Sequence, residues 1–286
     1  MKPLSGYTKP YAVLGHPIGH TLSPVMHNAS IASLGLDAIY LAFDVHPDRL
    51  LPVLEAMQSM GFGGVNLTIP HKEVAFRGLD QLDESARLVG AVNTVAFTPQ
   101  GLVGHNTDGY GFLKAMEESG GGIEGKRIFV LGAGGAGRAV ALVSARAGAA
   151  QIALADLDHS RCEAVAAEIH HAAPGIEALL ATTPDQQIAR CREADIIVQA
   201  TPVGMKPGDR PLLPSQAFRP GQHAFDLIYM VPETIFMAEA RLGGATTANG
   251  LGMLLHQGAR AFEIWTGQSP DIHAMRTALE RAVYPQ

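Results

Sequence analysis

The sequence predicts an α/β protein with mostly parallel sheets. Short apolar segments typical of buried strands alternate with segments of helical periodicity along the chain. The length of 286 residues corresponds to two domains or to one large α/β domain. Hydrophobic residues make up 47% of the chain and charged residues 17%, a composition that excludes a disordered chain and favours a compact globule.

In the N-terminal part, expected strands and helices alternate before a hairpin. Ser23 followed by Pro24 predicts a helix start, with Ser23 as the N-cap, and Gly35 suits the end of that helix. A second helix is expected over residues 47–60, and Pro70 is expected to end the third strand because it cannot continue a central ladder. Strands are expected at residues 11–15, 38–45, 65–69, 91–97 and 102–105, the last two as the hairpin.

Three consecutive glycines at residues 120–122 are the best local candidate for a domain boundary, after a helix expected over residues 109–118. The alternation of strands and helices then restarts. Strands are expected at residues 128–131, 152–155, 196–200 and 224–227, and helices at residues 136–147, 160–170, 233–242, 251–265 and 271–283.

Charge and cysteine content narrow the classes of function. Lys and Arg number 21 against 27 Asp and Glu, a net charge of −6, which disfavours binding to nucleic-acid phosphates. Two cysteines, Cys162 and Cys191, cannot form a disulfide framework, and the twelve histidines lack a carboxylate cluster, so no metal is expected. The most apolar stretch, residues 128–155, carries two arginines, and no signal peptide is visible. We therefore expect a soluble, cytoplasmic protein with no nucleic-acid or membrane partner.

A phosphate-binding loop is predicted where an expected strand meets an expected helix. Here the chain reads G-x-G-x-x-G, with Gly132, Ala133, Gly134, Gly135, Ala136 and Gly137. Gly132 permits the tight turn, Gly134 lets the backbone approach a pyrophosphate, and Gly137 allows the helix to pack closely on the strand. The free N–H groups of the helix would face the phosphates. This context favours a dinucleotide over a structural glycine turn or another nucleotide such as S-adenosylmethionine.

The residue type at the end of the next strand favours NAD over NADP. Asp156 follows that strand 19 positions after Gly137, where a carboxylate accepts hydrogen bonds from the adenosine ribose of NAD. The same carboxylate would repel the 2′-phosphate of NADP. Arg161 lies nearby in the sequence and would soften this repulsion, so NADP stays possible, and Asp156 has an alternative reading as an exposed carboxylate at a strand end.

Four polar clusters in the N-terminal half lie at expected strand or helix ends, where α/β sites usually form. Each also has a structural explanation. Ser23 would cap a helix, Asn93 and Asn106 would make turns, Lys72 would be an exposed surface residue, and Asp108 would be an N-cap. The clusters are residues 16–24, 66–72, 91–94 and 106–109.

Together with later segments, these clusters resemble the shikimate/quinate dehydrogenase family. The matching segments are GHPIGHTLSP, NLTIPHKEVAF, GAVNT, GHNTDGYGF, VLGAGGAGRA, QATPVGM and NGLGMLLHQGARAFEIW, in the family's order over nearly the full chain. The resemblance implies a substrate domain over residues 1–108, a Rossmann domain over 109–250, and C-terminal helices over 251–286 that return to the substrate domain. It also implies reversible hydride transfer between a nicotinamide cofactor and C3 of a cyclic hydroxy acid, shikimate or quinate.

The resemblance also assigns roles to individual residues. Lys72 matches the family's catalytic lysine, and Asp108 matches the aspartate that pairs with it and with the substrate hydroxyls. Thr21 and Ser23 match the two hydroxyl residues that hold the substrate carboxylate. Further substrate contacts are expected from Thr68, Asn93, Tyr229 and Gln257, and further cofactor contacts from Thr201, Gly250 and Met253.

A lysine beside a carboxylate suits the reduction of a ketone. Lysine is ordinarily protonated at neutral pH and can donate a proton, and Asp108 would favour that charged form. In the oxidation direction Lys72 must first lose its proton, so faster turnover is expected at alkaline pH. Ser23, at a helix start, would also bring free backbone N–H groups to a substrate carboxylate.

The sequence departs from the family pattern in three places. Thr21 stands where many members have serine, which adds a methyl group near C1 of the substrate. Asn249 replaces an aspartate. Residues 155–158 replace the Asn-Arg-Thr of NADP-dependent members, which removes the arginine that holds the 2′-phosphate. These departures favour a specialised, NAD-linked member.

Three other functions stay open. They are an NADP-dependent biosynthetic shikimate dehydrogenase, an enzyme like methylenetetrahydrofolate dehydrogenase, and a non-catalytic NAD-binding sensor. Thr21 and Ser23 speak against the second, and the retained pair of Lys72 and Asp108 speaks against the third. The sequence leaves shikimate versus quinate undecided, and it is compatible with a monomer or a homodimer.

Overall fold

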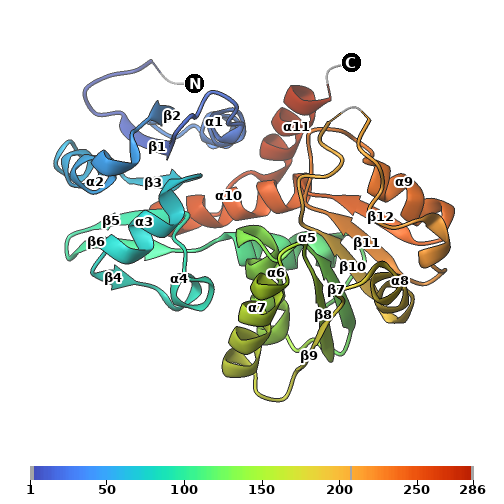
Figure 1. Cartoon of the computed structure of the whole chain (residues 1–286). Helices are drawn as coiled ribbons and strands as arrows, with labels where there is room; N and C mark the ends of the chain where they lie inside the picture. The colour runs from blue at the N-terminus through green and yellow to red at the C-terminus, as the bar shows by residue number, and fades with distance from the viewer. Residues whose placement is uncertain (1–2, 207, 285–286) are drawn as a thin grey trace. The chain divides into compact units, whose positions relative to one another are not determined.

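The computed structural model describes residues 3–206 and 208–284. Its elements form two compact units, labelled along the chain in Figure 1. Unit 1 comprises the chain up to Gly111 together with the chain from Leu254 onward, and unit 2 runs from Phe112 to Met253. The limits fall inside helices α5 (Asp108–Glu118) and α10 (Leu251–Thr266).

Unit 1 contains a mixed sheet with the strand order β2-β1-β3-β5-β6-β4. The central strand β1 runs parallel to β2 and β3, whereas β5 is antiparallel to both β3 and β6. Besides α5 and α10, the elements are β1 (Lys9–Gly15), α1 (Ser23–Ser33), β2 (Ala38–Asp44), α2 (Leu50–Ser59), β3 (Gly64–Leu67), α3 (His71–Gly78), β4 (Gln81–Leu82), α4 (Glu84–Val89), β5 (Thr94–Thr98), β6 (Gly101–His105) and α11 (Ile272–Val283).

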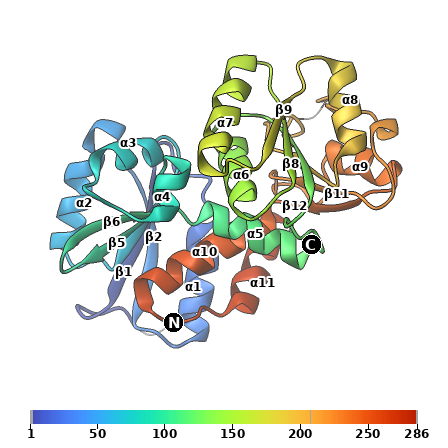
Figure 2. The same cartoon turned by 90° about the horizontal axis from the view of Figure 1, so that it is seen from below.

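Helices cover both faces of the unit 1 sheet, as Figure 2 shows. On one face, Leu54 of α2 and Ala75 of α3 join Leu14 and other strand residues in an apolar core. On the other face, α1 and α10 pack through an aromatic cluster that includes Tyr40 and Trp265. These two layers fix the carboxyl ends of β1 and β3, and the loops that follow them, on a rigid support.

Unit 2 is a fully parallel sheet with the order β12-β11-β10-β7-β8-β9. Its strand order reverses between β7 and β10, where ligands bind in open α/β sheets. The elements are β7 (Arg127–Leu131), α6 (Gly135–Arg146), β8 (Gln151–Ala155), α7 (His159–Ala172), β9 (Glu177–Leu180), α8 (Pro184–Glu193), β10 (Ile196–Gln199), β11 (His223–Asp226), α9 (Ile235–Leu242) and β12 (Thr246–Asn249).

The α/β fold class is confirmed, and each segment named as a strand from the sequence contains one, although β5 begins at Thr94 rather than at residue 91. Six α-helices and strands were missed: α3, β4, α4, β9, α8 and β12. The first five of these contain few continuous apolar residues, so periodicity did not reveal them. A local signal did exist for α8, because Thr183 and Gln186 form a reciprocal capping box, which the spacing Thr-x-x-Gln typifies. The expected third strand is also shorter, since β3 ends at Leu67 and Pro70 instead precedes α3.

The expected N-cap of the first helix was wrong. Leu22 is the N-cap of α1, and Ser23 is already helical, with Pro24 beside it in the first turn. Leu22 has φ −100° and ψ −3°, a helix-like conformation in which its own side chain makes no capping hydrogen bond. The hydroxyl of Ser23 is therefore available for other contacts.

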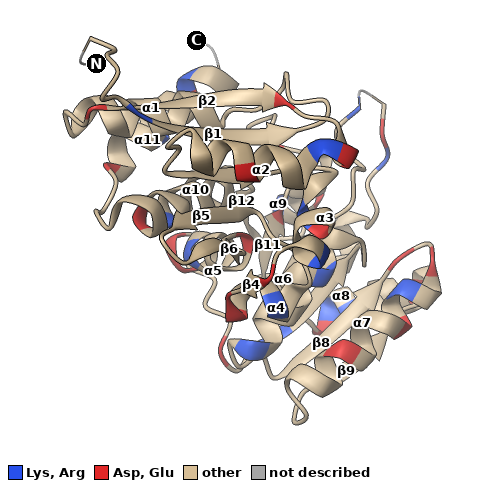
Figure 3. Cartoon of the chain, turned by 90° about the vertical axis from the view of Figure 1, so that its left-hand side faces the viewer, with Lys and Arg blue, Asp and Glu red and all other residues tan. Residues whose placement is uncertain are grey.

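Acidic and basic residues both occur along the helices shown in Figure 3, for example Arg161, Glu163 and Glu168 on α7. Among residues 3–206 and 208–284, no helix is long and apolar enough to cross a membrane. In the same part of the chain, no three His, Cys, Asp or Glu side chains are grouped in a way that could hold a metal ion.

Candidate active site

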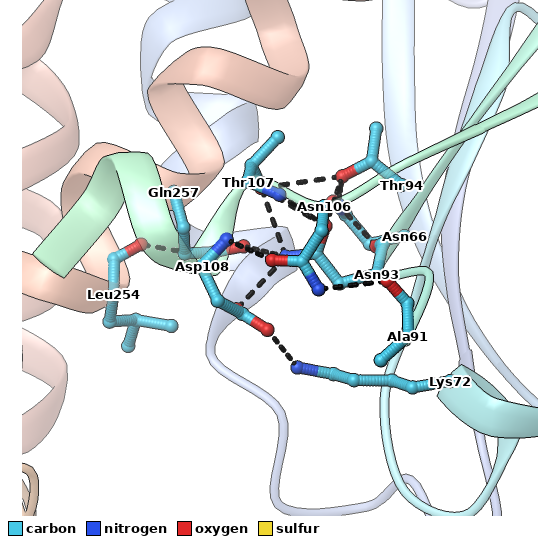
Figure 4. Close-up of polar contacts among 10 residues, drawn as sticks. All are labelled: Asn66, Lys72, Ala91, Asn93, Thr94, Asn106, Thr107, Asp108, Leu254 and Gln257. Atoms are coloured by element: carbon cyan, nitrogen blue, oxygen red, sulfur yellow. Dashed lines mark hydrogen bonds and ion pairs between the residues drawn. The ribbon is translucent and has the colours of Figure 1, made fainter. Parts of the chain in front are cut away.

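A short ion pair joins two helix starts in unit 1. Lys72 Nζ lies 2.6 Å from Asp108 Oδ2, and Figure 4 shows the two side chains pointing toward one another. Lys72 is the second residue of α3, and Asp108 is the first residue of α5. Their side chains are 30% and 19% exposed, so the pair is partly shielded from water and still accessible to a small molecule.

Backbone geometry holds both ends of this pair. Thr68 N donates to Leu14 O at 3.0 Å, and His71 N donates to Thr68 O at 2.8 Å, which turns the chain from β3 into α3. On the other side, Asp108 N donates to Asn106 Oδ1 at 3.0 Å, while Asn106 Nδ2 donates to Ala91 O at 3.0 Å. Two fixed turns therefore place the lysine and the carboxylate opposite each other.

Asn93 is the hub of the surrounding polar network. Its Nδ2 donates to Asp108 Oδ1 and to Thr107 Oγ1, both at 2.9 Å, and lies 3.4 Å from Gln257 Oε1. Its Oδ1 accepts from Thr107 N at 2.8 Å, which fixes which end of the amide faces the carboxylate. Gln257 in turn donates through Nε2 to Leu254 O at 2.9 Å. The structure thus brings Lys72, Asp108, Asn93 and Gln257 into one connected group (Figure 4).

Asn66, Thr94 and Thr107 also belong to this network, although no individual role was predicted for them. Asn66 Nδ2 donates to Asn93 O at 3.1 Å and to Thr94 Oγ1 at 3.0 Å, and Thr94 Oγ1 donates to Asn93 Oδ1 at 3.0 Å. All three residues are buried. For Asn66 on β3 and Thr94 on β5, a polar residue type within a buried strand was the available signal, because buried polar groups need partners.

The expectation of free N–H groups at the start of α1 was wrong. Ser23 N donates to Thr21 Oγ1 at 3.3 Å, Pro24 has no N–H, and the N–H groups of Val25 and Met26 donate to Leu22 O. Because Thr21 Oγ1 accepts a hydrogen bond, its own proton is free to point elsewhere. An anion at this place would therefore meet hydroxyl groups rather than unpaired backbone groups.

The glycine-rich loop of unit 2 has the shape that a bound pyrophosphate requires. Gly132 has φ +99°, a conformation that L side chains rarely adopt. A Cβ at Gly137 would lie 1.8 Å from Gly132 O, whereas a Cβ at Gly134 or Gly135 would meet no atom within 4 Å. Helix α6 begins at Gly135 without a side-chain cap, so its first N–H groups face an open approach. The residues present fit a dinucleotide.

Asp156 lies beside this loop, and its carboxylate is already hydrogen-bonded to the backbone. Its Oδ2 accepts from Ala133 N at 2.7 Å, and its Oδ1 accepts from Asp158 N at 2.9 Å. Arg161 points its guanidinium to Asp158, with Nε 3.4 Å from Oδ2. Arg161, which was expected to reduce the repulsion between Asp156 and a 2′-phosphate, is therefore paired with Asp158 instead.

The other residues expected at the cofactor also lie in unit 2. The Cγ2 of Thr201 packs against Gly132, and Thr201 N donates to Gln199 Oε1 at 2.5 Å. A Cβ at Gly250 would lie 2.2 Å from Leu227 O, so only glycine fits there. Met253 is half-buried near the start of α10. Tyr229, expected at the substrate, also belongs to unit 2, where burial raises the pKa of its hydroxyl.

A parallel sheet with this loop and a separate unit with a lysine–carboxylate pair define a dinucleotide-dependent oxidoreductase. Comparison with known families agrees. Models of the "Shikimate dehydrogenase substrate binding domain" and the "Shikimate 5'-dehydrogenase C-terminal domain" match residues 13–95 and 250–280. Residues 126–212 match the "lactate/malate dehydrogenase, NAD binding domain".

Individual proteins support the same assignment. Shikimate dehydrogenase (NADP(+)) of Methanopyrus kandleri is 43% identical over 276 residues, 95% of each chain. The structure of shikimate 5-dehydrogenase from Listeria monocytogenes in complex with shikimate and NAD has a TM-score of 0.92 and 36% identity, covering 98% of this chain and 99% of that one. Quinate dehydrogenase from Corynebacterium glutamicum in complex with NAD gives 0.85 and 32%, covering 95% and 98%. The chain belongs to the shikimate dehydrogenase family and is a nicotinamide-dependent oxidoreductase.

Proposed function

We propose that this enzyme transfers a hydride reversibly between NAD and C3 of shikimate or quinate, and that it prefers NAD to NADP. The observation that carries the reaction is the 2.6 Å contact between Lys72 Nζ and Asp108 Oδ2. This pair supplies a proton donor and acceptor within reach of a substrate hydroxyl. The bound nicotinamide supplies the hydride acceptor for oxidation and the hydride donor for reduction.

Lys72 is the group that moves the proton. In the reduction, its ammonium donates a proton to the carbonyl oxygen as that oxygen becomes a hydroxyl. In the oxidation, the neutral amine accepts the hydroxyl proton. Asp108 keeps the ammonium in place through the ion pair.

Neutral side chains around the pair are suited to orient the substrate. Asn93 donates to the carboxylate of Asp108, and Gln257 lies beside Asn93. The amide groups of both residues are therefore suited to bind the ring hydroxyls of a cyclic acid. The hydroxyls of Thr21 and Ser23 are suited to donate to its carboxylate. Thr68, directly after β3, completes the set of hydroxyl residues that we assign to the substrate.

The preference for NAD rests on the two carboxylates that follow β8. Asp156 is held on the phosphate loop by Ala133 N, and Asp158 is paired with Arg161. A 2′-phosphate in this position would meet like charge, whereas a ribose hydroxyl could donate to Asp156. The Methanopyrus kandleri relative named for NADP(+) marks the alternative, an NADP-linked biosynthetic enzyme.

The test is an initial-rate assay of shikimate and quinate, each with NAD and with NADP. We expect kcat/KM with NAD to exceed that with NADP by about tenfold or more, which corresponds to about 1.4 kcal/mol. A higher value with NADP would reject the NAD preference and support the biosynthetic alternative. NAD binding without turnover of either acid would reject the proposed substrates and favour a sensor or an enzyme of the methylenetetrahydrofolate dehydrogenase type.

A further inference from the structure

The hydroxyl of Tyr40 begins a directed chain of hydrogen bonds that ends at the catalytic pair. Tyr40 OH donates to Asn66 Oδ1 at 2.6 Å. From there the chain continues through Asn66 Nδ2 to Thr94 Oγ1 at 3.0 Å, Thr94 Oγ1 to Asn93 Oδ1 at 3.0 Å, and Asn93 Nδ2 to Asp108 Oδ1 at 2.9 Å. The other oxygen of Asp108 holds Lys72.

The direction of each bond in this chain is determined. Asn66 Nδ2 faces Asn93 O, which can only accept, so Oδ1 of the same amide must face the hydroxyl of Tyr40. Because Oδ1 can only accept, Tyr40 must be the donor. Asn66 is buried, and an amide oxygen that lost this donor would stay unpaired away from water.

Two neighbouring residues, Asn28 and His27, hold Tyr40 in place. Its backbone N–H and C=O pair with the side chain of Asn28, at 2.9 Å and 2.8 Å, as a neighbouring strand would pair with them. The ring of His27 stacks on the Tyr40 ring, with centroids 4.2 Å apart and planes 8° apart. Asn28 and His27 both lie on α1, the helix that begins at Ser23. A fully buried hydroxyl is thereby fixed in position and direction.

Ser23 reaches the same hydroxyl. Burial raises the pKa of Tyr40 well above its ordinary value, and the neighbouring Ser23 side chain opposes that rise. The hydroxyl of Ser23 therefore lies next to that of Tyr40. Tyr40 thus lies between Ser23, which we assign to the substrate carboxylate, and the chain of hydrogen bonds that leads to Lys72.

We infer that Tyr40 is a positioning residue, which holds the Asn93 amide against Asp108 and thereby sets the geometry of Lys72. This inference rests on the proposed roles of Lys72 and Asp108. Thr107 N provides a second anchor for Asn93 Oδ1, so loss of the tyrosine hydroxyl should weaken the arrangement rather than abolish it. Weaker donation from Asn93 leaves more negative charge on Asp108, which then holds the proton of Lys72 more strongly.

The variant Tyr40→Phe tests this inference, with Tyr11→Phe as its matched control. Tyr11 lies on β1 in register with Tyr40 and stacks on Trp265 with centroids 5.4 Å apart. For Tyr40→Phe we expect kcat of the oxidation to fall about 5- to 10-fold, with KM for NAD unchanged, and the pH–kcat curve to move to higher pH. A purely structural role would lower the amount of folded enzyme but leave the pH–kcat curve in place.

Thr94→Val provides a second route that leaves Tyr40 intact. This variant interrupts the chain of hydrogen bonds one step further along, so it should reproduce the loss in kcat. The kcat of the double variant Tyr40→Phe/Thr94→Val should be about the same as that of either single variant. Additive losses, or equal effects of Tyr40→Phe and Tyr11→Phe, would overturn the inference.

A measurement without substrate separates this inference from the proposed function. The NMR signals of the Asn93 side-chain amide should move in Tyr40→Phe and in Thr94→Val, and stay in place in Tyr11→Phe. If the native enzyme turned over neither acid, the proposed function would fail while these signals still decided whether Tyr40 positions Asn93. Unchanged signals in an active Tyr40→Phe enzyme would contradict the inference alone.

Discussion

Lys72 illustrates how an ordinary surface residue type becomes specific through its surroundings. Lys72 and Asp108 are 36 positions apart in the sequence, and each has a common structural use at a helix start. No local pattern brings them together, so only the family resemblance paired them in advance. The structure adds the network of Asn66, Thr94 and Thr107, whose contacts join distant strands and leave no periodic signal in the sequence.

Replacing Lys72 should remove the proton donor and leave cofactor binding intact. For Lys72→Ala we expect kcat to fall by about 10²- to 10⁴-fold in both directions, with the affinity for NAD unchanged. Steady-state rates and titration of NAD binding measure the two effects. Lys114→Ala is the control, because it breaks an ion pair of the same 2.6 Å length on the exposed side of α5. Comparable losses in the two variants would reject the assigned role.

Asp226 predicts a measurable effect of pH on unit 2. Burial raises its pKa to about 6, against hydrogen bonds from Thr234 and Ile228. The pKa of Asp226 in the folded state lies above its value of about 4 in the unfolded state, so protonation of Asp226 stabilises the folded state. This contribution to the free energy of unfolding is fully present below pH 4 and is lost as the pH rises through 6. Asp226→Asn should remove about 2–3 kcal/mol of that pH dependence. Urea unfolding of the native protein and of Asp226→Asn at pH 4 and pH 7 measures this difference. If the unfolding free energy changed by the same amount between the two pH values in both proteins, the prediction would be refuted.

At the scale of elements, the loop between β7 and α6 was the most predictable part of the fold. Its four glycines lie within six residues, and the need for them follows from local sterics, as the clash of a Cβ at Gly137 with Gly132 O shows. Elements that depend on neighbours were harder to predict. Strand β12, for example, pairs with β11 although its sequence Thr-Thr-Ala-Asn carries little apolar character.

The segment after β8 gives a prediction about the cofactor. Changing residues 156–158 from Asp-Leu-Asp to Asn-Arg-Thr removes two carboxylates and introduces a guanidinium. We expect the ratio of kcat/KM values for NADP and NAD to rise by about 100-fold or more, because like charge is replaced by opposite charge. Leu157→Arg alone, in which both carboxylates remain, is the control and should shift the ratio less. If the triple change left this ratio unaltered, residues other than 156–158 would determine the preference for NAD over NADP.

At the scale of the whole molecule, one buried group in each unit should change the stability of that unit as the pH falls, and the two effects have opposite signs. In unit 1, burial lowers the pKa of His27 to about 3, and among the described residues neither of its ring nitrogens has a hydrogen-bond partner. Its folded pKa lies below the unfolded value of about 6.5, so unit 1 loses stability as pH falls below 6.5, by about 3 kcal/mol at pH 4. Over the same range, Asp226 makes unit 2 more stable.

Hydrogen exchange of amides assigned to each unit measures this contrast. Protection of unit 1 should decrease between pH 7 and pH 4, after correction for the intrinsic rates. Protection of unit 2 should change less favourably over the same range in Asp226→Asn than in the native protein. His27→Phe keeps an aromatic ring in the stack on Tyr40 and should flatten the response of unit 1. If His27→Phe and Asp226→Asn left these two pH responses unchanged, His27 and Asp226 would not contribute to the pH dependence of their units.

The aromatic cluster of unit 1 has one more consequence. Trp265 is the single tryptophan of the chain, and it lies in that cluster, with Nε1 donating to Val95 O at 3.1 Å. Its fluorescence is therefore an intrinsic optical reporter of unit 1 alone. An unfolding curve followed by tryptophan emission and one followed by circular dichroism should coincide if both units unfold together. The two curves should separate if unit 2 unfolds independently of unit 1.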